Sequence, residues 1–176
     1  VDTTFAGEPI DPEVAQAVRA AGQLLESLGH RVEPVTIRAD VAGMMRAWTD
    51  IVAVGTALGI RRALKRRPLT DDLVEGVGRG AVAHAEGLHP TRYLEAVGAI
   101  HAFGREMAAV FEPETGSGPD ILLSATLAEP PARVGRFAHG TEDYLGYRMG
   151  RQGIFAYSPF CAIFNASGQP AASLPL

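Results

Sequence analysis

The spacing of apolar residues along the chain predicts three long helices. Over residues 11–28 they recur every three or four positions behind an Asp-Pro-Glu start, where aspartate can cap the first turn and proline suits its geometry. The same spacing predicts helices over residues 40–67, which Pro68 stops, and from about 91 to 111. A shorter helix is expected over residues 141–151.

Three other apolar stretches predict strands. Residues 31–37 follow the first helix directly, residues 121–123 are typical of a short buried strand, and the run 171–176 resembles a strand that enters a core. A helix that leads straight into a strand indicates a layered α/β arrangement. No repeat and no long linker divides the chain, so we expect one unit of the α/β class.

Composition narrows the class of protein. The chain has 176 residues, 47% of them hydrophobic, which suffices for one domain with a substantial core. A net charge of −4 does not favour nucleic acid as a partner, and no apolar run reaches the roughly 18 residues of a membrane-spanning helix. The single cysteine, Cys161, cannot form an internal disulfide, so we expect a cytoplasmic location. Both ends look cut, which predicts a piece of a longer polypeptide.

One strongly basic stretch stands out, because Arg61, Arg62, Lys65, Arg66 and Arg67 place five cations within seven residues. Such a cluster could attract phosphate or a membrane surface. It also suits the end of a helix, where cations complement the dipole. We favour the helix end, because no aromatic residues alternate with the cations and the whole chain is acidic.

The sequence contains no metal or cofactor motif. No two of the five histidines have the spacing that places both imidazoles on one helical face. Gly76, Gly78 and Gly80 lack the further glycine and the preceding strand of a dinucleotide-binding loop, so we assign them to close helix packing. We therefore expect no cofactor and no metal.

The residues alone do not assemble a catalytic site. No serine lies in a Gly-x-Ser-x-Gly turn, and the only lysine, Lys65, belongs to the basic stretch, where a neutral base is not expected. Cys161 lies among apolar neighbours, which favours a buried inert thiol or a place in a pocket wall over a nucleophile.

Two blocks of the sequence resemble the amidase signature family. One is Asp120-Ile-Leu-Leu-Ser-Ala-Thr-Leu-Ala-Glu-Pro-Pro-Ala-Arg-Val-Gly135, which is similar to the family's strand-and-turn block, although Ala125 replaces a proline. The other is Ser158-Pro-Phe-Cys-Ala-Ile-Phe-Asn-Ala-Ser-Gly-Gln-Pro-Ala-Ala-Ser-Leu-Pro-Leu176, which resembles a later block whose core is Asn, two residues, Gly-x-Pro-Ala and a strand that ends in Ser-x-Pro. The opening helix also fits, and the blocks occur in the family's order.

The resemblance implies a fold and an activity. The fold would be a mixed sheet covered by helices, present here as a single partial domain over 1–176 with a variable helical insert at about 40–112. Family members hydrolyse amides with a Ser–cis-Ser–Lys triad through an acyl-enzyme. The segment that carries the triad has no match in this chain, which therefore looks like the C-terminal half of an amidase. No residue of this chain is expected to be catalytic, and we expect the chain alone to be inactive.

The resemblance also implies what this half contributes. It would pack on the triad-bearing N-terminal half and form a wall of the channel for a small-molecule amide, linear or cyclic, as in amidases of the 6-aminohexanoate cyclic-dimer hydrolase type. It allows a homodimer and implies neither nucleic acid nor membrane as a partner. The predicted substrate-binding residues are Ser158, Phe160, Cys161, Asn165, Trp48 and Tyr157.

Two alternatives stay open at this point. A non-catalytic binding or assembly module that retained an amidase-like half-fold would lack the triad as well. The other alternative is a nucleic-acid binder that uses the basic stretch, whose binding would weaken as salt is added. An affinity that does not change with ionic strength would exclude this alternative.

Overall fold

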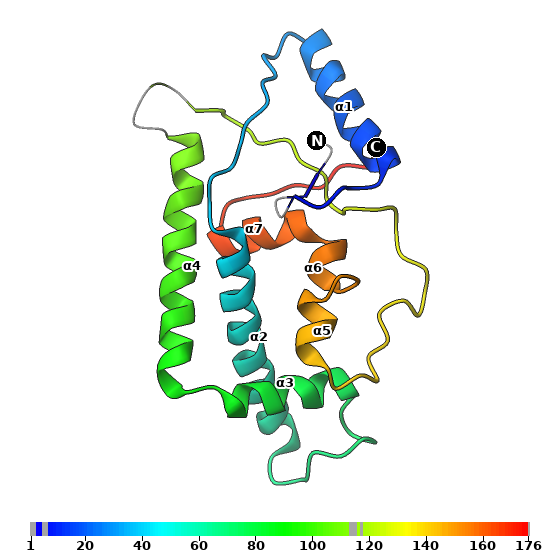
Figure 1. Cartoon of the computed structure of the whole chain (residues 1–176), viewed down its shortest axis with the longest axis vertical. Helices are drawn as coiled ribbons and strands as arrows, with labels where there is room; N and C mark the ends of the chain where they lie inside the picture. The colour runs from blue at the N-terminus through cyan, green and yellow to red at the C-terminus, as the bar shows by residue number, and fades with distance from the viewer. Residues whose placement is uncertain (1–2, 5–6, 113–115, 117, 176) are drawn as a thin grey trace.

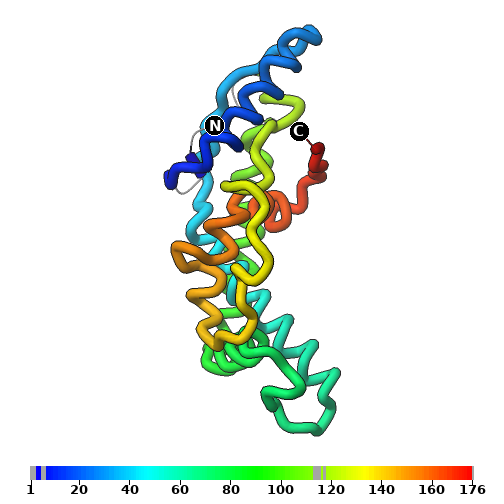
Figure 2. Tube along the Cα trace, turned by 90° about the vertical axis from the view of Figure 1, so that its right-hand side faces the viewer, coloured from blue at the N-terminus to red at the C-terminus, as the bar shows by residue number. Residues whose placement is uncertain are grey.

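The chain folds into helices joined by long irregular segments (Figure 1). The computed structural model describes residues 3–4, 7–112, 116 and 118–175. The molecule is elongated, with the longest helices running along its length (Figure 2). The helices are α1 (Pro12–Ser27), α2 (Val41–Leu64), α3 (Gly76–Gly87), α4 (Pro90–Phe111), α5 (Tyr144–Met149), α6 (Ile154–Tyr157) and α7 (Pro159–Ser167).

The predicted α/β class, with a mixed sheet covered by helices, is wrong. Within the described residues the only β pairing is a single bridge between Thr3 and Pro9. A strand needs a neighbour for its backbone hydrogen bonds, and the stretches 31–37, 121–123 and 171–175 find none in the described part of the chain. Ile121, expected in a buried strand, is 83% exposed.

The predicted helices of the central region do form, with shifted ends. α2 begins after Asp40, whose side chain accepts a hydrogen bond from Gly43 N at 2.8 Å, and it ends where Lys65 turns left-handed at φ +57°. α4 begins with Pro90 in its first turn. The polar stretch after Pro68 forms a turn, and α3 starts at Gly76.

The main core lies where α2, α4 and α7 meet. α2 packs along α4 and α3, and α7 lies against α2 and α4. α7 contributes Ala162, Ile163 and Ala166 to a cluster whose other buried members are Val41, Met44, Phe103, Met107 and Phe155.

A second, smaller cluster attaches α1 to the loop that follows residue 120. Phe160 on α7 is 3% exposed and packs there with Ile10, Val18 and Ala128. Because Phe160 belongs to this cluster while Ala162, Ile163 and Ala166 belong to the main core, α7 packs into both clusters.

The glycines of α3 allow close packing, as the sequence predicts. A Cβ atom built on Gly76 would lie 2.2 Å from the carbonyl oxygen of Gly140, and one on Gly80 would lie 2.2 Å from that of Glu142. Only glycine therefore lets α3 approach the segment that leads into α5. None of the helices in the described residues combines the length and apolar character needed to cross a bilayer.

Candidate functional site

Most of the residues predicted to bind substrate lie at the junction of α6 and α7. Pro159 occupies the first turn of α7, and Ser158 precedes it with its amide bonded to Ile154 O at 2.8 Å. The helix ends at Gly168, whose φ of +73° belongs to the left-handed region that favours glycine. The first part of this sequence block thus forms a short helix, and residues 169–175 continue from it as an irregular segment rather than a strand.

Three of these residues form an open polar face on α7. Ser158, Cys161 and Asn165 follow one another at intervals of three and four residues, so they share one side of the helix. Ser158 and Cys161 are half-buried and Asn165 is exposed. The expectation of a buried thiol is therefore wrong, because Cys161 is partly accessible.

The open face borders the other block of sequence that carries the family resemblance. The Cys161 thiol donates to the carbonyl oxygen of Thr126 at 3.4 Å, and the Thr126 hydroxyl lies 3.2 Å from that of Ser173. The structure therefore brings both blocks together beside α7. We call Ser158, Cys161, Asn165, Thr126 and Ser173 the α7 face.

Tyr157 and Phe160 stand apart from this face. Tyr157 accepts a hydrogen bond from Ala132 N through its hydroxyl at 3.0 Å, and its ring packs with Phe137 at 5.1 Å between centroids. The Arg136 guanidinium lies over the same ring at 5.3 Å. The pKa of Arg136 is raised, mainly by the hydrogen bond of its guanidinium to Glu129. Tyr157 thus anchors the loop after Pro131, while Phe160 is buried in the smaller core cluster.

Trp48 lies on α2, away from the α7 face. Its half-buried side chain packs against the main core cluster. α7 contributes Ile163 to that cluster, and Ile163 lies on the opposite side of α7 from Cys161. The structure therefore brings together Ser158, Cys161 and Asn165 and leaves Trp48 outside that group.

A buried polar cluster escaped the sequence analysis. Asp50, in the middle of α2, is only 6% exposed. One carboxylate oxygen lies 2.8 Å from His84 Nε2 on α3, and the other accepts from Arg92 Nε on α4 at 2.8 Å. The only signal in the sequence was an acidic residue within a mostly apolar helical stretch.

This cluster extends to α5 through an aromatic residue. The Tyr144 hydroxyl donates to the carbonyl oxygen of Thr49 at 2.9 Å, and burial raises the pKa of Tyr144 to about 12. Arg148 lies over the rings of Tyr144 and Phe155, and burial lowers the pKa of its guanidinium. These hydrogen bonds join α2 to three other helices: to α3 through His84, to α4 through Arg92 and to α5 through Tyr144.

In the part of the chain that the structure describes, no three histidine, cysteine, aspartate or glutamate side chains gather closely enough to hold an ion.

Comparisons with known proteins point to one family. The model of the family described as Amidase matches residues 1–176. A 6-aminohexanoate-cyclic-dimer hydrolase from Paenarthrobacter ureafaciens is 30% identical over 177 residues, covering 95% of this chain and 34% of that protein. An indoleacetamide hydrolase from Bradyrhizobium diazoefficiens is 25% identical over 95% of this chain and 29% of its own length.

An amidase from Pseudomonas putida is 26% identical over 99% of this chain and 35% of its own length. The chain thus spans about a third of the length of the curated relatives it matches. No solved structure was found to match.

Proposed function

The chain belongs to the Amidase family, and on that premise we propose that it is a segment of an enzyme that hydrolyses a small carboxylic amide. A serine supplied by the rest of the enzyme would attack the amide carbonyl, expel the amine and form an acyl-serine, which water then cleaves. We place this enzyme in the cytoplasm, because the segment has a single cysteine. The family resemblance and the names of the relatives support the reaction class.

The role of this segment is to form a wall of the substrate channel. The observation that carries this proposal is the contact of Cys161 with Thr126, which joins the two family blocks into one open polar face. An amide substrate presents a carbonyl acceptor and an N–H donor. The exposed carboxamide of Asn165 and the hydroxyl of Ser158 can each donate and accept, so the face is complementary to both groups.

The triad would come from an N-terminal half that packs on this segment. The position of the only lysine supports this division. Lys65 follows the end of α2 that lies farthest from α7, and it is exposed (Figure 1). A side chain at that end of α2 is outside hydrogen-bond reach of a serine at α7 and cannot serve as its base. We therefore propose that the chain alone is inactive. The family resemblance also allows a homodimer of the complete enzyme.

A hydrolysis assay tests this division of labour. The chain alone and a polypeptide that joins it to a triad-bearing N-terminal half are supplied with the 6-aminohexanoate cyclic dimer, indole-3-acetamide and a short aliphatic amide. A serine-directed covalent label is applied in parallel. We expect turnover and labelling only in the longer polypeptide, at a serine outside this chain.

Two other results would change the assignment. Turnover by the chain alone, with the label on Ser158, would contradict the proposal that the nucleophile comes from elsewhere. A longer polypeptide that binds amides without hydrolysing them would favour the alternative, a non-catalytic binding or assembly module that kept an amidase-like half-fold.

A further inference from the structure

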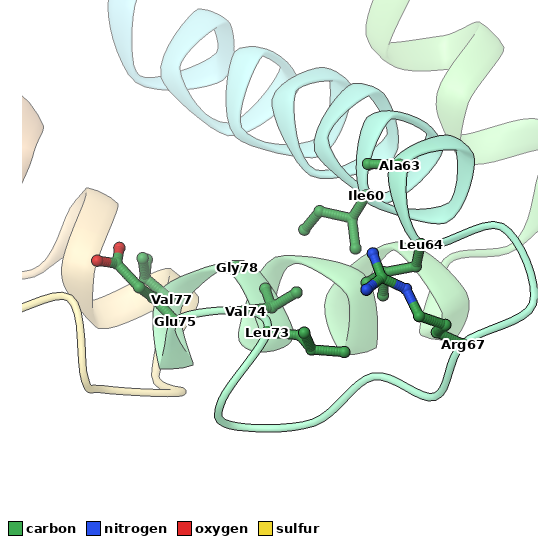
Figure 3. Close-up of a pocket in the computed structure, with 9 residues that line it drawn as sticks. All are labelled: Ile60, Ala63, Leu64, Arg67, Leu73, Val74, Glu75, Val77 and Gly78. Carbon is green, nitrogen blue, oxygen red and sulfur yellow. The ribbon is translucent and has the colours of Figure 1, made fainter.

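An apolar hollow lies at the far end of α2, away from the α7 face. It is an open depression with a volume of about 420 Å³, lined by the last turns of α2, the loop that follows it and the start of α3 (Figure 3). This volume falls in the range of small-molecule sites. Its apolar lining consists of Ile60, Ala63, Leu64, Leu73, Val74 and Val77.

The local backbone explains why the hollow is open. Lys65 ends α2 in a left-handed conformation, and the loop beyond it swings out before α3 begins. Gly78 forms part of the lining. A Cβ atom there would lie 2.8 Å from Val74 Cγ1 and 3.4 Å from Ile60 Cδ1, so any side chain at this position would intrude on two residues of the wall.

A cation stands over one end of this apolar space. The Arg67 side chain extends from the loop toward Leu64 and α2 (Figure 3). Within the described residues no carboxylate forms an ion pair with Arg67, whereas Arg61 in the same basic stretch is paired with Glu86. The acidic residue in the lining, Glu75, is engaged by His139 at 2.9 Å.

We infer that this hollow binds an aliphatic monocarboxylate. The planar guanidinium of Arg67 can hold a carboxylate with two parallel hydrogen bonds, and the alkyl chain would cover the apolar lining formed by α2 and α3. A polyanion would engage the whole basic stretch and leave the apolar lining exposed. The monocarboxylate matches both features, and the site is independent of the α7 face.

The inference is tested by titrating the chain with hexanoate and octanoate while recording methyl NMR spectra. We expect saturable shifts of the methyl groups of Ile60 and Val74, with octanoate binding more tightly because it covers more apolar surface. Hexylammonium has the same chain with the opposite charge and should not bind. Equal binding of hexylammonium, or shifts that leave Ile60 unaffected, would overturn the assignment.

Three variants separate this site from a general effect of charge. Arg67→Gln should weaken octanoate binding about tenfold, because a charge-assisted hydrogen bond is lost. Arg66→Gln is the matched control, since Arg66 is exposed in the same basic stretch and lies outside the lining, and it should change binding less than about twofold. Ala63→Phe, at an exposed position of the lining, should block the hollow.

Circular dichroism of each variant is the control that its helices are retained. An equal loss of affinity in Arg66→Gln and Arg67→Gln would contradict a discrete site. Unchanged binding in Ala63→Phe would contradict it as well.

Discussion

The carboxylate of Asp50 shows how much one buried residue can determine. It binds His84 and Arg92 and so connects three helices, while its own side chain is 8% exposed. Asp50→Ala should lower the free energy of unfolding by about 2 kcal/mol, because the His84 imidazole and the Arg92 guanidinium lose their partner while solvent partly compensates them. Urea denaturation measures the change. Asp72→Ala, at an exposed position, is the control and should change it by less than about 0.5 kcal/mol.

Tyr144 should make the free energy of unfolding depend on pH in the alkaline range. Its pKa is raised from about 10 to about 12, mainly because burial disfavours the phenolate. The folded state therefore holds its proton more tightly than the unfolded state. This contribution is complete below pH 10 and is lost as the pH rises toward 12.

The free energy of unfolding should accordingly fall across that interval. Tyr144→Phe should remove this alkaline component and cost about 1 kcal/mol at neutral pH, because the Thr49 carbonyl loses its donor. Chemical denaturation at several pH values measures both effects. An identical alkaline decline in Tyr144→Phe would contradict the assignment to this residue.

Some residues of the candidate site come from the sequence analysis, and others escaped it for a physical reason. The spacing of Ser158, Cys161 and Asn165 places them on one face only if the segment is helical. The family resemblance predicted a turn followed by a strand there instead. The tie between Asp50 and Arg92 joins residues that are 42 positions apart, so no local pattern could reveal it. The packing role of Gly76 and Gly80 was predictable, because helical spacing puts both on one side of the helix.

At the scale of elements, the long helices were predictable, whereas the short helix α7 and the absence of strands from the described residues were not. A helix satisfies its backbone hydrogen bonds within its own segment, so the apolar spacing of α1, α2 and α4 sufficed. A strand depends on a partner that its own sequence does not contain. Residues 31–37 and 121–123 have strand-like composition but no neighbour within the described residues.

Two glycines should respond to alanine in opposite ways. Gly168 ends α7 in the left-handed region, so Gly168→Ala should destabilise the fold by about 1 kcal/mol. Gly98 lies within α4, where an added Cβ meets nothing within 4 Å, so Gly98→Ala should stabilise it by about 0.8 kcal/mol. Thermal denaturation of both variants measures the difference. Equal shifts of the same sign would contradict the assigned ends of α7.

For the whole molecule, the exposed apolar residues indicate a surface that another part of the enzyme covers. Ile121 is 83% exposed and Leu174 is 76% exposed, and both lie in extended segments rather than helices. The chain also spans only about a third of its relatives. We propose that a triad-bearing half covers these segments in the complete enzyme.

The isolated chain should therefore self-associate as its concentration rises. Ile121→Lys should shift it toward the monomer, because it places a charge in an extended apolar segment. Leu94→Lys, on the exposed side of α4 at a residue 70% exposed, is the control and should leave the association unchanged. Light scattering over a concentration series measures both. An equal effect of the two substitutions would contradict the role of the extended segments.

The most direct test of the account is the KM of Asn165→Ala in the amide-hydrolysing polypeptide that contains this chain. If the α7 face lines the channel, loss of a substrate hydrogen bond should raise KM about fivefold and leave kcat within about twofold. Gln152→Ala, at an exposed position outside the face, should change neither. An unchanged KM in Asn165→Ala, or an equal rise in Gln152→Ala, would contradict the assignment of this face to the substrate channel.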